Sequence, residues 1–293
     1  MGTPEFAVAP LQALVESGEQ IVAVVTMPDK PSGRGMKLQQ SPVKQYAQAI
    51  GIPVLQPEKL KDESFVQTLR YYHADLQIVV AFRMLPEVVW AMPRLGTFNL
   101  HASLLPQYRG AAPINWAVIN GEKFTGVTTF MLKHEIDTGN IIMQRRIPIG
   151  DDENVGSVHD RLMNIGSELV LQTVQKIAES DQNGTTLQTI AQDDIRIADC
   201  KPAPKIFKED CAIDLSKTAE QVHNFVRGLS PYPAAWTDLT IDHKTYNGVK
   251  IYAVAKGQGA ITLQCADGPI SVLELQLPGK KRMDAKALLN GLR

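Results

Sequence analysis

The sequence has few cysteines, no long apolar run and no excess of charge of either sign. Its three cysteines, Cys200, Cys211 and Cys265, lack a Cys-x-x-Cys spacing, which argues against a disulfide framework and a cysteine-built zinc site. No apolar run approaches the roughly 20 residues of a membrane-spanning helix, and the first residues lack the basic and apolar regions of a secretory signal. The formal net charge of −1 means that a polyanionic partner must meet a local basic patch. We therefore expect a cytoplasmic protein that does not bind membranes.

The length and the order of apolar patterns indicate an α/β domain followed by a second domain. The chain has 293 residues, of which 44% are hydrophobic, and two domains are the expectation at that size. In the first two thirds, apolar runs alternate with helical patterns, as in strands joined by crossover helices in a mostly parallel sheet. We predict strands at 21–26, 76–81 and 97–101, and helices at 114–120 and 157–179.

Beyond a polar stretch without periodicity, the pattern changes to one helix, near residues 218–229, and short strands. The strands are predicted at 234–241, 249–255, 260–265 and 270–277. Asn247-Gly248 and Asp267-Gly268 stand where hairpin turns belong. This pattern predicts a small antiparallel OB-like β-barrel. We divide the chain into domain 1–182, linker 183–200 and domain 201–293.

Three polar residues are candidates for catalysis. On a strand at 97–101, Asn99 and His101 face the same side, with His101 at the carboxyl end, where ligands bind in open α/β sheets. A second predicted strand, 126–136, runs into a turn that begins at Asp137, which would then lie at a strand end too. An amide that stabilises oxyanion charge, an imidazole that carries a proton and a carboxylate that orients it suit acyl transfer to an amine.

The same three residues also fit purely structural roles when spacing alone is considered. An Asn-x-His pair on a strand is often structural, and Asp137 is first of all a turn residue. His134, Asp137 and His101 could be imagined around a metal, but a zinc site needs three or four well-placed donors and the sequence shows no further one. We predict no metal site.

Two segments carry local positive charge. Lys30, Arg34, Lys37 and Lys44 lie in a Pro- and Gly-broken segment where Asp29 is the one acidic residue, which suits phosphate contacts. The C-terminal tail, which includes Lys280 and Lys281, is similarly basic. A solvated surface explains either segment equally well.

The chain resembles the folate-dependent formyltransferases. The resemblance rests on Asn-x-His-x-Ser-Leu-Leu-Pro at residues 99–106 and on Asp-x-Gly at residues 137–139, and it extends to 2–6, 28–35, 41–44, 108–113 and 277–281. It implies a Rossmann-like formyltransferase domain, a linker and a C-terminal OB-like domain. It also implies 10-formyltetrahydrofolate as formyl donor and the α-amino group of methionine on initiator tRNA as acceptor, in a monomer.

The resemblance assigns roles to residues. Asn99 would bind the formyl oxygen, His101 would assist proton transfer, and Asp137 would orient His101. Folate would contact two segments, represented by Ala81, Phe82, Arg83, Leu85, Ser103, Leu104, Leu105 and Pro106. The tRNA would contact Lys30, Arg34, Lys37, Lys44, Arg109, Lys280 and Lys281.

Two alternatives and one departure from the family pattern accompany these expectations. The acceptor could be a small amine, such as an amino sugar nucleotide or glycinamide ribonucleotide, or the protein could bind RNA without catalysis. The family places an apolar strand ahead of the Gly2-Thr3-Pro4 loop, whereas this sequence begins with the loop. A sheet without that strand lacks several buried side chains, each worth about 1.5–3 kcal/mol, so we expect marginal stability.

Overall fold

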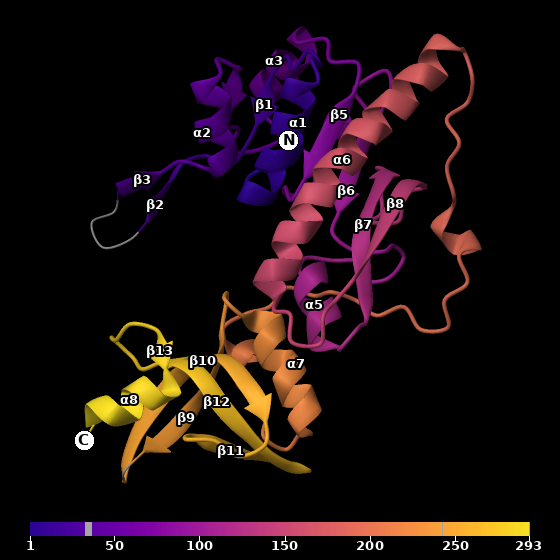
Figure 1. The fold of residues 1–293 in the computed structure, drawn as a ribbon. Coiled ribbons are helices and arrows are strands. Elements are labelled where there is room, and N and C mark those ends of the chain that lie inside the picture. The colour runs from indigo at the N-terminus through magenta and orange to yellow at the C-terminus, as the bar shows by residue number, and fades with distance from the viewer. Residues whose placement is uncertain (33–36, 242, 293) are drawn as a thin grey trace. The chain divides into compact units, whose positions relative to one another are not determined.

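A computed structural model describes residues 1–32, 37–241 and 243–292. The chain divides into two compact units (Figure 1). The first comprises Met1–Arg109, Gly126–Arg146 and Asp160–Cys200, and the second Gly110–Thr125, Ile147–His159 and Lys201–Arg293. The boundaries inferred from sequence, 1–182, 183–200 and 201–293, stay a proposal. Within the described ranges, no helix is long and apolar enough to cross a membrane.

The first unit is built on parallel strand pairs covered by helices. In chain order, its elements begin with η1 (Glu5–Ala7), α1 (Val8–Glu16), β1 (Val24–Val25), β2 (Lys30–Ser32), β3 (Lys37–Gln39), α2 (Pro42–Ala49), β4 (Val54–Leu55) and α3 (Glu63–Tyr71). They continue with β5 (Gln77–Val80), α4 (Glu87–Trp90), β6 (Thr97–His101), β7 (Phe124–Met131), β8 (Ile141–Pro148), α6 (Val155–Gln182) and η2 (Gln192–Asp194). Strands β5, β6, β7 and β8 form one sheet in that order, and β1 pairs with β4. The β1–β4 and β5–β6 pairs are parallel and β6–β7 is antiparallel.

Strand β6 presents different side chains to its two faces. Leu100 packs against α6, because Gly166 of that helix lies next to it, and period-two alternation sends Asn99 and His101 to the opposite face. Opposite them on β7 stand Phe130 and Thr128. Leu100 thus faces α6, whereas the opposite face carries Asn99 and His101 beside the buried Phe130.

Met1 and Gly2 lie between β1 and β5. The Gly2 amide donates to the Val25 carbonyl at 3.0 Å, and the Val80 amide donates to the Met1 carbonyl at 2.9 Å. A pocket of about 480 Å³ adjoins them and is lined by residues that include Leu14, Ile78 and Ile177. The expectation of marginal stability stays a prediction.

The second unit is a curled antiparallel sheet with three α-helices. Its elements are α5 (Pro113–Ile119), η3 (Glu209–Cys211), α7 (Ala219–Leu229), β9 (Ala235–Ile241), β10 (Lys244–Lys256), β11 (Thr262–Cys265), β12 (Gly268–Gln276), β13 (Met283–Asp284) and α8 (Ala285–Leu292). The strand order is β11-β12-β10-β9, with β13 beside β12. Among the described strands, the ends β11 and β9 do not pair with each other, so the predicted barrel is an open half-barrel.

Three local predictions are corrected. Asn247-Gly248 is not a hairpin turn: it lies within β10, where the register to β9 shifts between Tyr246 and Val249, and Gly248 takes the positive φ of such a bulge. Strand 126–136 ends at Met131, so Asp137 lies in a loop beyond the strand. The strand predicted at 21–26 is reduced to Val24–Val25. The Asp267-Gly268 turn does join β11 to β12.

Candidate active site

His101 and Asp137 approach each other at the end of β6. The distance from His101 Nδ1 to Asp137 Oδ2 is 3.9 Å, and their side chains are 8% and 15% exposed. The other ring nitrogen, Nε2, lies 2.9 Å from the Tyr108 carbonyl. Because a carbonyl only accepts, Nε2 carries a proton, which leaves Nδ1 as the atom that takes up or releases one. That atom is the one that faces the carboxylate.

Asn99 supplies an amide on the same face of the sheet. Its side chain is half-buried, and among the described residues its amide has no hydrogen-bond partner. A half-buried amide at the end of an α/β strand is available to donate to a carbonyl oxygen. This arrangement fits a formyl oxygen.

The loop that follows β6 is held against β7 by a hydrogen-bond network. The Thr128 hydroxyl donates to the Ser103 carbonyl at 2.6 Å and accepts from the Leu105 amide at 3.1 Å. Gln144 Nε2 donates to the Leu105 carbonyl and to the Thr128 hydroxyl, both at 2.9 Å. The loop is therefore rigid, with Ser103, Leu105 and Pro106 buried and Leu104 half-buried.

Three segments around the site contain non-glycine residues with positive φ. They are Ala81 after β5, Tyr108 after β6 and Asp137 after β7, with φ of 47°, 58° and 54°. Such backbone is sparsely populated for residues with a Cβ and is concentrated at functional sites. The described residues include six such positions; these three follow the strands of the site, and His73, Ala234 and His243 lie elsewhere.

The predicted folate residues on the β5 side divide into two kinds. Ala81 is exposed and Phe82 half-buried, so both have surface to offer. The Arg83 guanidinium instead donates to the carbonyls of Pro57 and Glu58, and Leu85 is buried in the core with Val79 and Val89. Arg83 and Leu85 therefore shape this loop from within.

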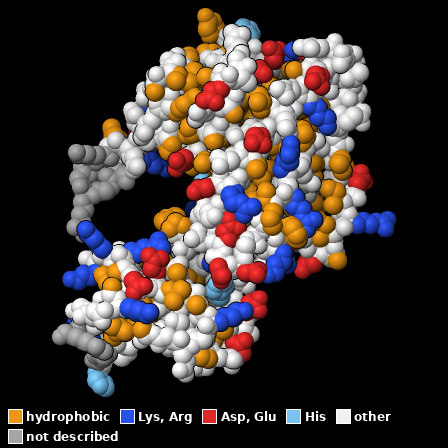
Figure 2. Space-filling view, in the orientation of Figure 1, with side chains coloured by type: hydrophobic (Ala, Val, Ile, Leu, Met, Phe, Trp, Pro, Cys, Tyr) orange, Lys and Arg blue, Asp and Glu red, His pale blue; other side chains and the backbone are white. Residues whose placement is uncertain are grey.

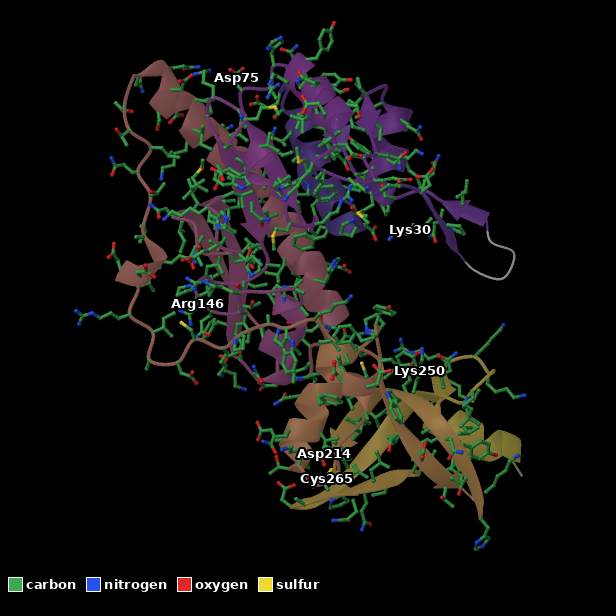
Figure 3. All side chains as sticks on the ribbon, turned by 180° about the vertical axis from the view of Figure 1, so that it is seen from behind. Lys30, Asp75, Arg146, Asp214, Lys250 and Cys265 are labelled. Atoms are coloured by element: carbon green, nitrogen blue, oxygen red, sulfur yellow. The ribbon has the colours of Figure 1, made fainter. Side chains whose placement is uncertain are left out.

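The predicted tRNA residues are also placed unequally. Lys30, on β2 and labelled in Figure 3, is exposed, as are Lys280 and Lys281. Lys44 is buried in the first turn of α2, 2.6 Å from Asp29, and this hydrogen bond lowers the pKa of the Asp29 carboxyl. Lys44 therefore pairs with a carboxylate of its own segment, and its contact with tRNA stays a prediction. Arg34 lies outside the described residues, and Lys37 begins β3.

Basic side chains are visible on one face of the second unit, near β13 (Figure 2). Lys280 and Lys281 precede this strand, and Arg282 lies 4.3 Å from the Tyr252 ring centroid. No group of three or more metal-binding side chains occurs within the ranges that the structure describes.

One residue that is hydrogen-bonded to two loops of the site was not predicted from the sequence. Gln192, in the segment taken as a linker, is 4% exposed and bonds to Arg109 and to the Asp137 loop. Its only signal in the sequence is a polar residue in an aperiodic stretch, which predicts solvent exposure.

The chain belongs to the formyl transferase family. The family model "Formyl transferase" matches residues 1–174, and "Formyl transferase, C-terminal domain" matches residues 205–293. The fold is thus that of a one-carbon transferase, and Asn99, His101 and Asp137 stay its predicted catalytic residues.

Relatives in sequence are more specific. The chain is 58% identical to a methionyl-tRNA formyltransferase of Bacteroides thetaiotaomicron, over 100% of this chain and 94% of the relative. It is 55% identical to a protein of the same name from Parabacteroides distasonis, over 100% and 94%. Among solved structures, the sugar 3N-formyl transferase WlaRD shares the fold, with a TM-score of 0.63 at 17% identity over 96% of this chain and 97% of that one.

Proposed function

We propose that this protein transfers the formyl group of 10-formyltetrahydrofolate to the α-amino group of methionine on initiator tRNA, for the initiation of translation. The observation that carries the proposal is identity above half, over the full chain, to methionyl-tRNA formyltransferases. Likeness to sugar formyltransferases at 17% identity concerns the fold alone, so a small amine acceptor is not favoured. The retained Asn99, His101 and Asp137 speak against an idle RNA-binding protein.

We assign the chemistry to three side chains. The folate supplies the activated formyl group. The Asn99 amide donates to the formyl oxygen as negative charge develops there, an interaction worth about 2.7–4 kcal/mol of barrier in known oxyanion sites. His101 Nδ1 accepts the proton that the methionine amine loses and returns one to the leaving nitrogen. Asp137, 3.9 Å away, stabilises the imidazolium while it holds that proton.

The substrates are assigned to surfaces within each unit. Folate is expected against Ala81 and Phe82 and against the Ser103–Pro106 loop, whose rigidity limits the entropy lost on binding. The tRNA backbone is expected at exposed Lys30 and, in the second unit, at Lys280 and Lys281. Arg34 and Lys37 remain predicted contacts. We further propose a cytoplasmic monomer that needs no metal.

The test is a transfer assay with labelled 10-formyltetrahydrofolate. Charged initiator tRNA, charged elongator tRNA and amino sugar nucleotides are offered side by side. We expect label on initiator methionyl-tRNA, and at least about a hundredfold less with the His101→Ala variant. Label on a sugar nucleotide alone would show that the proposed acceptor is wrong. Binding of tRNA without formyl transfer would show that the protein is not the proposed enzyme.

A further inference from the structure

Gln192 uses its complete hydrogen-bonding capacity on two loops of the site. Its Nε2 donates to the carbonyls of Asp137 and Gly139, both at 2.8 Å. Its Oε1 accepts from Arg109 Nε at 3.1 Å and from Nη2 at 2.7 Å. Two donors and two acceptor positions are all that a side-chain amide offers. No other side chain of this length can make the same four bonds.

These two loops are the ones that contain Asp137 and contact His101. Asp137 belongs to one loop. The other loop contains Arg109 and, next to it, Tyr108, and the Tyr108 carbonyl accepts from His101 Nε2. The 3.9 Å between His101 Nδ1 and Asp137 Oδ2 exceeds a hydrogen bond. The distance between the two groups is therefore set by strand β6, which carries His101, and by the loop that carries Asp137.

The backbone around Gln192 is itself anchored to the Asp137 loop. Two residues before it, Ile190 pairs with Ile141 through two backbone hydrogen bonds of 2.8 Å each, and Asn140 Nδ2 donates to the Thr189 hydroxyl at 3.3 Å. The segment therefore runs beside residues 137–141 and presents Gln192 to them in one position. The buried amide is a fixed part of the site.

We propose that Gln192 is a positioning residue of the active site, whose amide locks the Asp137 loop to the Tyr108–Arg109 loop so that the carboxylate faces His101. This inference rests on the function proposed above. It predicts an effect on turnover that passes through Asp137, with little effect on substrate binding.

The experiment compares four full-length variants and one double variant with the wild-type chain in steady-state formyl transfer to methionyl initiator tRNA. Gln192→Met keeps the length and removes all four bonds, and Gln192→Glu keeps the acceptor for Arg109 but loses both donors. Gln188→Met is the matched control, because Gln188 is exposed in the same segment. Asp137→Asn, alone and combined with Gln192→Met, tests whether the effect of Gln192 depends on the Asp137 carboxylate.

We expect Gln192→Met and Gln192→Glu to lower kcat about 10- to 100-fold, as for a displaced catalytic group, with both KM values within about threefold of wild type. Gln188→Met should match wild type. In the Asp137→Asn background, Gln192→Met should have almost no further effect, because a residue that acts through another is non-additive with it. A general loss of structure would instead lower kcat by the same factor in the wild-type and in the Asp137→Asn background.

Several outcomes overturn the proposal. An unchanged kcat in folded Gln192→Met does so, as does an equal loss in the Asp137→Asn background. If Gln192→Met does not fold, Gln192→Glu decides, and wild-type kcat in that variant also overturns it. If the wild-type chain formylates a different amine, the proposed acceptor fails, while the same comparison proceeds with that amine. If Asp137→Asn alone leaves kcat unchanged, both proposals fail.

Discussion

Replacing Asp137 by asparagine keeps its shape and removes its charge. At about 4 Å, opposite unit charges attract by about 1 kcal/mol in bulk water and about 4 kcal/mol at an effective dielectric constant of 20. His101 and Asp137 are 8% and 15% exposed, so the higher value is the better guide. Loss of about 4 kcal/mol when His101 holds its proton would slow the reaction about 1,000-fold, and we expect at least about 100-fold.

The assay is single-turnover formyl transfer, with folate and tRNA affinities measured separately. Asp193→Asn is the control, since this exposed carboxylate lies in the same unit. The combined His101→Ala and Asp137→Asn variant should be no slower than the worse single variant, because the two groups act as a unit. A folded Asp137→Asn enzyme at the wild-type rate, beside an inactive His101→Ala, would refute the electrostatic argument.

Two further predictions concern stability and binding. Gly139→Ala would place a Cβ 1.6 Å from the Met131 carbonyl oxygen. We therefore expect thermal unfolding to show a free energy of unfolding lower by about 1–3 kcal/mol, and formyl transfer to be slower. Unchanged stability together with an unchanged transfer rate would contradict this packing. Charge reversal at Lys280 and Lys281 should weaken tRNA binding and reduce its salt dependence, with folate affinity unchanged; an unaltered salt slope would exclude them as phosphate contacts.

Periodic patterns in the sequence predicted one strand and one helix of the first unit closely. The strand at residues 97–101 has the predicted bounds, and the predicted helix 157–179 lies within Val155–Gln182. Both have strong periodic patterns bounded by turn or capping residues. Asn99 and His101 on one face follow from the period of the strand alone.

The wrong predictions concern local patterns that are compatible with two structures. Contacts with distant parts of the chain decide which of the two forms. Asn247-Gly248 fits a hairpin turn or a bulge, and the pairing of β10 with β9 selects the bulge. The hydrogen bond of Lys44 to Asp29, fifteen residues earlier in the chain, could not be predicted from a local pattern either. Single-sequence patterns contain no information on such partners.

The order of residues was enough to predict an α/β fold with an amide and a histidine on one face of a strand, because side-chain alternation and strand direction are local properties of the backbone. The approach of Asp137 to His101, and the hydrogen bonds of Gln192, depend on a strand end and two further segments that converge from positions 101, 137 and 192. Their geometry is set by packing and hydrogen bonds between segments distant in the chain, which leave no periodic trace in the sequence.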